Sequence, residues 1–118
     1  MSTFRGWIGV DLDGTLAYYD TWRGNEHVGE PVHAMMDRVK SWLKGGKTVK
    51  IFTARVSPQA IRLNGQTLEQ TRAPIEAWLI KHLGRPLEIT HEKDMAMIEL
   101  WDDRAVSVEL NTGRILTR

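Results

Sequence analysis

The sequence contains no cysteine, and its 118 residues carry nearly balanced charge, with 16 Lys and Arg against 15 Asp and Glu. The lack of cysteine excludes disulfides and thiolate metal sites, which fits a reducing compartment. A net charge of +1 indicates no general nucleic-acid surface, because such surfaces carry a basic excess. No apolar run approaches the roughly 20 residues of a membrane span, and residues 1–6 lack the apolar segment of a signal peptide. We therefore expect a cytoplasmic protein without a membrane partner.

The length and the apolar content are those of one small globular domain. A chain of 118 residues is in the size range of a single domain, and 42% of its residues are hydrophobic, which is an ordinary fraction for a folded protein. We therefore expect one domain over residues 1–118.

Two aspartates lie at the end of an apolar run near the start of the chain. Residues 7–12 read as a buried strand that carries Asp11 and is followed by Asp13, and the chain then turns at Gly14. Side chains two residues apart in a strand point the same way, so the two carboxylates are expected to face one site. At about 4 Å their repulsion is on the order of 4 kcal/mol, and such a pair shares a proton or holds a cation such as Mg²⁺. The alternative is a simple Asp-Gly turn without chemistry.

A second strand end carries groups that suit phosphate. Thr53, Ala54 and Arg55 follow the β-branched run 48–52. A hydroxyl beside free backbone N–H groups at a strand end forms a phosphate cradle. For Arg55, contact with an anionic substrate and pairing with a surface carboxylate both remain open.

A third strand end repeats the acidic pattern. Asp102 and Asp103 follow the apolar run 97–101. Two acidic pairs at the same edge of one sheet concentrate negative charge, which a divalent cation offsets.

The remaining patterns predict the fold class. Apolar residues recur at helical spacing after Pro31 and again from about residue 71, where we place the start of the helix close to Pro74. Between them, residues 56–73 are polar and fit either a short helix or a substrate-facing loop. A turn at residues 111–113 predicts a C-terminal hairpin of 106–110 and 114–116. The order of elements favours an α/β, three-layer, Rossmann-like domain with a mainly parallel sheet. Ligands of such domains bind beyond the carboxyl ends of the strands, where all three polar strand ends lie.

The segment 17–30 is irregular and rich in aromatic residues. It fits a hairpin or a loop that leaves the first strand and returns, with Tyr18, Tyr19 and Trp22 packed on the domain edge. The functional alternative is a flap over the site, in which Tyr18, Tyr19 or Trp22 contacts a base or another apolar substrate group and Arg23 lies near a phosphate.

Residues 11–16, Asp-Leu-Asp-Gly-Thr-Leu, resemble the first motif of the haloacid dehalogenase superfamily, D-x-D-x-[TV] after a hydrophobic strand. The later motifs of that superfamily follow in the same order: a Thr or Ser after a second strand (Thr53), a Lys or Arg (Lys93), and an acidic pair after a further strand (Asp102 and Asp103). The resemblance spans nearly the whole chain. Lys93 also fits an exposed side chain in a polar cluster.

The resemblance implies a role for each of these residues. In the superfamily the first aspartate is a nucleophile, the second is a general acid/base, and the Thr and Lys hold the phosphoryl oxygens. Carried over to this sequence, Asp11 attacks phosphorus, Asp13 transfers protons, and Thr53 and Lys93 hold the phosphoryl group. The resemblance also implies Mg²⁺ held by Asp11, the backbone carbonyl of Asp13, and Asp102, with Asp103 orienting a metal-bound water.

The resemblance further implies an open site. Superfamily members often carry a cap domain after the first motif or between the second and third, and neither gap here has room for one. A capless site admits a large phosphorylated substrate, whereas a small one needs closure by the aromatic flap or by a second subunit of a homo-oligomer.

The expected function is therefore Mg²⁺-dependent phosphomonoester hydrolysis, with a nucleotide, a nucleic-acid end, a sugar phosphate or a phosphoprotein as substrate. A receiver-like phosphoacceptor domain is the first alternative, although its acidic pair comes before the phosphoacceptor Asp, the reverse of the order here. A non-catalytic Mg²⁺-binding domain that acts by binding a partner is the second.

Overall fold

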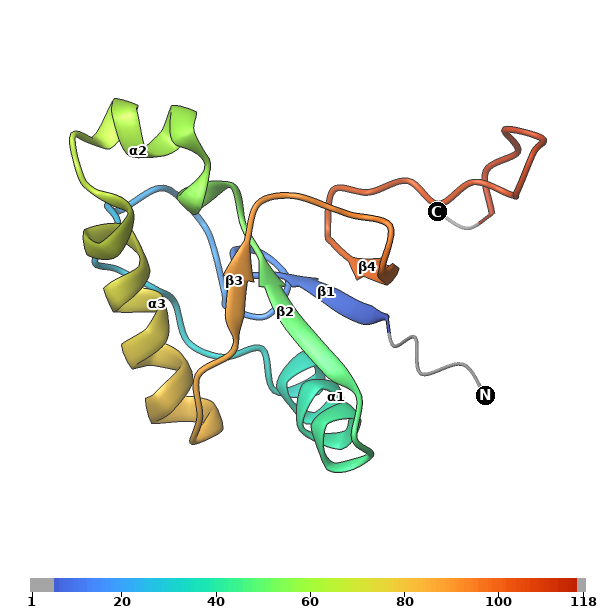
Figure 1. Cartoon of the computed structure of the whole chain (residues 1–118), viewed down its shortest axis with the longest axis horizontal. Coiled ribbons are helices and arrows are strands. Elements are labelled where there is room, and N and C mark those ends of the chain that lie inside the picture. The colour runs from blue at the N-terminus through green and yellow to red at the C-terminus, as the bar shows by residue number, and fades with distance from the viewer. Residues whose placement is uncertain (1–5, 117–118) are drawn as a thin grey trace.

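The computed structural model describes residues 6–116, so residues 1–5 and 117–118 lie outside the description. The expected absence of a signal peptide rests partly on the first five of these residues. The strands are β1 (Trp7–Asp11), β2 (Thr48–Phe52), β3 (Glu88–Thr90) and β4 (Met97–Trp101). The helices are α1 (His33–Lys44), the short 3₁₀ helix η1 (Ala54–Val56), α2 (Pro58–Asn64) and α3 (Leu68–Leu83), as Figure 1 shows. None of the described helices has the length and apolar character needed to cross a membrane.

The strands form one parallel sheet in the order β3-β2-β1-β4. From β1 the chain moves outward through β2 to β3, and then returns to the other side of β1 to add β4. This reversal makes the boundary between β1 and β4 a topological switch point, where open α/β sheets bind their ligands. The predicted α/β class with a parallel sheet is confirmed.

The core lies between one face of this sheet and the two longer helices. Side chains alternate along each strand, so Ile8 and Val10 share a face with Val49 and Ile51, their partners in the register with β2. These side chains belong to one buried cluster with residues of α1 and α3: Met35, Met36, Val39, Ile75, Trp78 and Leu79. Burial of this apolar face holds both helices against the sheet.

The opposite face of the sheet carries Trp7 and Lys50. The Lys50 ammonium lies 4.6 Å from the centre of the Trp7 ring, and the Trp7 indole N–H donates a 2.8 Å hydrogen bond to Asp94. The connection from β3 to β4 therefore runs over this face and is tied to the beginning of β1.

Two helix boundaries differ from the prediction. Helix α1 begins at His33, because Pro31 is instead bridged to Ala17 at the base of the preceding loop. Helix α3 begins at Leu68, six residues before the predicted start near Pro74. Thr67 and Gln70 form a capping box that starts α3, and the helix tolerates Pro74 in its interior.

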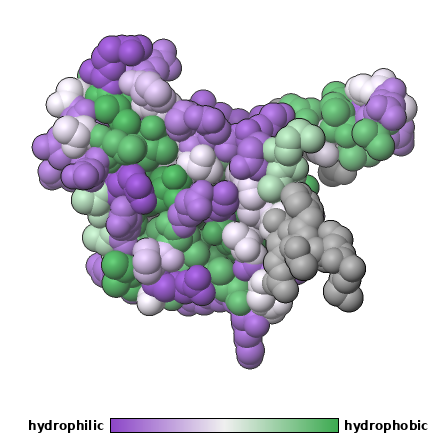
Figure 2. All heavy atoms as spheres, in the orientation of Figure 1, coloured by the Kyte–Doolittle hydropathy of each residue, from purple (hydrophilic) through white to green (hydrophobic). Residues whose placement is uncertain are grey.

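The other uncertain segments also take definite forms. Residues 56–73 contain the short helix α2, capped by the Ser57 hydroxyl and ended by Gly65 in the left-handed conformation, as well as the first residues of α3. The predicted C-terminal hairpin exists as a turn closed by one isolated bridge between Val108 and Ile115, without assigned strands. This arm extends from the body, and Figure 2 shows apolar side chains on it.

The aromatic segment after β1 is a loop closed at its base. The Tyr18 N–H donates to the Glu30 carbonyl at 2.7 Å, and the Trp78 indole N–H of α3 donates to the Gly29 carbonyl at 2.7 Å. The two ends of the loop approach so closely that a Cβ at Gly29 would lie 1.9 Å from the Tyr18 carbonyl oxygen. The loop therefore leaves the end of β1 and returns beside it, which keeps its residues near the carboxyl edge of the sheet.

Candidate active site

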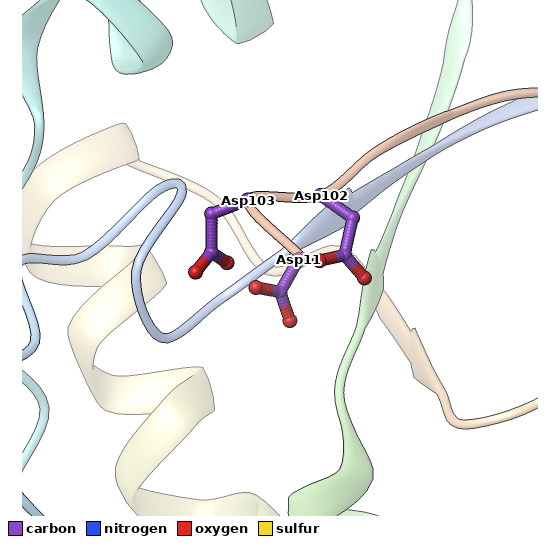
Figure 3. Close-up of side chains that lie close together, drawn as sticks. All are labelled: Asp11, Asp102 and Asp103. Carbon is purple, nitrogen blue, oxygen red and sulfur yellow. The ribbon is translucent and has the colours of Figure 1, made fainter. Parts of the chain in front are cut away.

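Three carboxylates gather where β1 and β4 end. Asp11 is the last residue of β1, and Asp102 and Asp103 directly follow β4, the neighbouring strand. One carboxylate oxygen of each lies within 4.8 Å of the others. Figure 3 shows the three side chains gathered at this point. The parallel pairing at the switch point thus brings together residues that are about ninety positions apart in the sequence.

The turn after β1 contacts Asp103 through two of its residues, Thr15 and Gly14. The Thr15 hydroxyl lies 3.1 Å from Asp103 Oδ1 and 3.3 Å from Asp11 Oδ2, and it accepts a 3.0 Å hydrogen bond from the Asp103 N–H. Gly14 has φ +93°, and a Cβ there would lie 2.8 Å from Asp103 Oδ2. A side chain at residue 14 would force the Asp103 carboxylate to shift and would be strained at this φ, so both observations favour glycine in this turn.

The cluster changes the protonation of its members. The pKa of Asp11 is raised to about 8: burial is the largest cause, the hydrogen bond to Asp103 and the negative charges of Asp102 and Asp103 add to it, and the hydrogen bond from Thr15 opposes it. Burial alone would raise the pKa of Asp103, but its hydrogen bonds with Asp11 and Thr15 outweigh that effect and lower it. Asp11 therefore carries a proton at neutral pH when nothing else offsets the charge of its neighbours.

The donor set fits Mg²⁺. Carboxylate oxygens are the ligands that this ion prefers, and its bond lengths of about 2.0–2.1 Å place two opposite ligands roughly 4.2 Å apart. The oxygens of Asp11, Asp102 and Asp103 lie within 4.8 Å of one another, so a small inward shift of these side chains would let one ion contact all three. The carboxylate of Asp13 is not in this group, because it has another partner; the resemblance assigns the metal contact of Asp13 to its backbone carbonyl.

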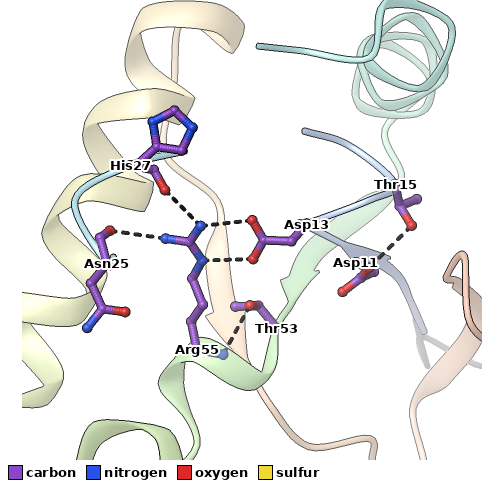
Figure 4. A network of polar contacts seen from close by, with 7 residues as sticks. All are labelled: Asp11, Asp13, Thr15, Asn25, His27, Thr53 and Arg55. Atoms are coloured by element: carbon purple, nitrogen blue, oxygen red, sulfur yellow. Dashed lines mark hydrogen bonds and ion pairs between the residues drawn. The ribbon is translucent and has the colours of Figure 1, made fainter. Parts of the chain in front are cut away.

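Asp13 forms a partly buried ion pair with Arg55. Both nitrogens of the guanidinium edge, Nε and Nη2, donate to the two Asp13 oxygens at 2.8 Å. Figure 4 shows that the other side of the guanidinium faces the loop after β1, where Nη1 donates to the Asn25 carbonyl at 3.0 Å and Nη2 to the His27 carbonyl at 2.8 Å. Arg55 is 7% exposed. The sequence left two roles open for Arg55, contact with an anionic substrate and pairing with a surface carboxylate. The structure shows pairing with a carboxylate, but this carboxylate is Asp13 of the site.

The carboxylates open into a cavity of about 500 Å³. Its walls contain most of the residues predicted for the site: Asp11, Asp13, Tyr19, Trp22, Thr53, Ala54, Arg55, Asp102 and Asp103. Thr53 is buried, and its hydroxyl accepts the Arg55 N–H at 3.2 Å, which leaves its own proton available to a ligand. The structure therefore brings an acidic end, a hydroxyl and two aromatic side chains into one concave space.

Two predicted residues lie elsewhere. Arg23 pairs with Asp20 at 2.8 Å and lines a smaller neighbouring hollow. Lys93 is exposed and lines a separate hollow beside β4, with no hydrogen bond or ion pair among the described residues. The next residue, Asp94, is bonded to Trp7 at the beginning of β1, roughly 13 Å of strand from Asp11. The connection that carries Lys93 is thus anchored at the opposite edge of the sheet.

The sequence interpretation gave no role to Thr15, Leu63 and Asn64, which belong to the site. Thr15 was visible as the last position of D-x-D-x-[TV] but was given no role. Arg104, Leu63 and Asn64 line the cavity. Arg104 directly follows the acidic pair, which was a usable signal, whereas the positions of Leu63 and Asn64 depend on how α2 folds back over the sheet edge.

Comparison with known proteins supports the fold and nothing finer. No family model and no curated protein sequence matches the chain. Among solved structures, the chain is similar to a conserved protein from Bacteroides thetaiotaomicron, with 15% sequence identity and a TM-score of 0.56. The match covers 86% of this chain and 78% of that one. At this identity the likeness shows a shared fold.

The raised pKa of Asp11 predicts a pH-dependent stability in the absence of metal. The folded protein holds this proton up to about pH 8, whereas the unfolded chain releases it near pH 3.8. The contribution of Asp11 to stability is therefore fully present below about pH 4 and is lost as the pH rises to about 8. We expect the free energy of unfolding, measured by urea titration in EDTA, to fall from pH 5 to pH 8 in the wild type and to fall much less in Asp11→Asn. An equal fall in both proteins would show that another group is responsible.

Proposed function

We propose that this chain is a Mg²⁺-dependent phosphomonoester hydrolase that acts through an aspartyl-phosphate on Asp11, as the resemblance to the haloacid dehalogenase superfamily implies. The observation that carries the proposal is the cluster of Asp11, Asp102 and Asp103 beside Thr53 in one cavity at the switch point. A turn or a surface acidic patch would not place these groups around a shared space with a buried hydroxyl.

In the proposed first step, a carboxylate oxygen of Asp11 attacks the phosphorus, and the bond from phosphorus to the ester oxygen breaks. Asp11 must be ionised to attack, yet the pKa of about 8 keeps it protonated in the metal-free protein. When bound, Mg²⁺ would offset the negative charge of the three carboxylates and of the phosphoryl group. The covalent intermediate divides one difficult hydrolysis into two easier displacements.

Asp13 is proposed to transfer the protons. As the superfamily resemblance implies, it protonates the leaving oxygen in the first step and accepts a proton from the attacking water in the second. Arg55 fixes its carboxylate through two 2.8 Å hydrogen bonds, so Asp13 has a fixed position two residues from the nucleophile. The ion pair is well suited to the second of these tasks, for which Asp13 must be a carboxylate.

The phosphoryl oxygens need donors on the side away from the carboxylates. Thr53 offers its hydroxyl proton, and Ala54 is the first residue of η1, whose N–H has no partner within the helix. The resemblance gives the cationic role to Lys93, but the cavity contains Arg104 instead. The Arg104 guanidinium has no ion pair among the described residues, whereas Arg55 is committed to Asp13. We propose Arg104 as the cation that contacts the phosphoryl group.

The proposed activity is tested first by hydrolysis of p-nitrophenyl phosphate with Mg²⁺ and with EDTA. We expect Mg²⁺-dependent turnover by the wild type and none above background by Asp11→Asn, because the amide keeps the shape of the side chain and cannot act as the nucleophile. Asp37→Asn, an exposed carboxylate on α1, is the matched control and should retain wild-type turnover. Turnover that persists in Asp11→Asn, or in EDTA, would contradict the proposal.

The assignment of the cation is tested in the same assay by Arg104→Gln and Lys93→Gln. A hydrogen bond to a charged group contributes about 1.5–3 kcal/mol, so loss of the phosphoryl contact should lower kcat/KM roughly tenfold to a hundredfold. We expect this loss in Arg104→Gln, with partial recovery in Arg104→Lys. If the loss falls on Lys93→Gln instead, the order of the motifs predicts the cation better than the geometry of the cavity.

A further inference from the structure

We infer that the cavity binds a nucleobase as well as a phosphate, so that the substrate is a nucleoside monophosphate. The inference rests on the proposed function for the phosphate end and adds a second contact, the aromatic wall formed by Trp22 and Tyr19. These side chains, 44% and 41% exposed, lie in the same cavity as Asp11 and Thr53.

Trp22 is held in place by the catalytic ion pair itself. The Arg55 guanidinium lies 4.8 Å from the centre of the Trp22 ring, and the same guanidinium forms the bidentate pair with Asp13. One face of the indole is thus occupied by a buried cation whose position is fixed by four hydrogen bonds. An aromatic ring fixed in this way is a preformed stacking surface, because its orientation does not have to be selected when a ligand binds.

Two further residues that line the cavity suit a flat and mainly apolar group. Leu63 of α2 is 78% exposed although it lines the cavity, so a ligand there would cover apolar surface that now contacts water. Asn64 donates its amide N–H to the Ala60 carbonyl at 2.8 Å, which leaves its amide oxygen as an acceptor for a ring amino group. A base combines two stackable faces with a polar edge, whereas a sugar offers hydroxyls that this wall would leave unpaired.

Size and charge favour a free nucleotide over a nucleic-acid end. The cavity of about 500 Å³ lies within the range of about 300–1,000 Å³ that small-molecule sites occupy. A polynucleotide would also need a basic track for its further phosphates, and the chain carries a net charge of only +1. One phosphate at the acidic end and one base at the aromatic end use the groups that the cavity provides.

The experiment measures binding in the Asp11→Asn background with Mg²⁺, so that its result does not depend on turnover. Calorimetry compares adenosine 5′-monophosphate with ribose 5-phosphate, which has the same phosphate and sugar without the base. Stacking on an aromatic side chain contributes about 1–3 kcal/mol per base, so we expect the nucleotide to bind roughly tenfold or more tightly. Adding Trp22→Leu should reduce this preference to less than threefold. Tyr18→Leu, an exposed aromatic residue outside the cavity, is the matched control and should retain it.

Equal binding of both ligands, or a preference that survives Trp22→Leu, would overturn the inference even if the wild type hydrolyses aryl phosphates. A preference for the nucleotide that depends on Trp22 would support the base site even if the wild type hydrolyses nothing. A short 5′-phosphorylated oligonucleotide is the third ligand. We expect it to bind no more tightly than the mononucleotide, and tighter binding would overturn the assignment to a free nucleotide.

Discussion

Mutual repulsion among carboxylates is the constraint around which this site is built. Parallel pairing places Asp11 beside Asp102 and Asp103 at the switch point, and Asp13 follows two residues later. The protein neutralises only one of these four charges with a buried cation, through the ion pair of Asp13 with Arg55. The other three are left to a proton on Asp11 or to an ion from solution. Burial is the largest cause that raises the pKa of Asp11 to about 8, and the hydrogen bond to Asp103 and the charges of Asp102 and Asp103 act in the same direction. Such a cluster is costly for a fold and is typical of a site that binds a cation.

Arg55 links the chemistry of the site to the architecture around it. Its guanidinium joins Asp13 to two carbonyls of the loop after β1 and lies over the ring of Trp22. The loop therefore has a definite position although it contains no regular secondary structure. Loss of Arg55 would leave the partly buried Asp13 without its partner and the aromatic wall without support, so one side chain positions both the proposed acid/base group and the proposed base site.

The sequence predicted those structural features that depend on the local pattern of apolar and polar residues. The apolar runs before Asp11, Thr53 and Asp102 predicted the parallel strands and the sheet edge at which these residues meet. Pro74 misled the prediction of α3, because the capping box at Thr67 and Gln70 outweighs the missing N–H of one interior proline. Lys93 was placed by the order of motifs, but its position depends on a connection that crosses the sheet without a helix. The pairing of Arg55 with Asp13 likewise depends on tertiary packing, since the two are 42 residues apart.

The most direct test of the central claim is calorimetric titration of the wild type with Mg²⁺ at pH 7 in buffers of different ionisation enthalpy. We predict one bound ion per chain, with release of a proton, because the ion replaces the proton that Asp11 carries in the metal-free protein. Asp102→Asn should weaken binding at least tenfold, and Asp37→Asn should bind like the wild type. Absence of Mg²⁺ binding by the wild type, or unchanged affinity in Asp102→Asn, would contradict the account of this cluster as a metal centre.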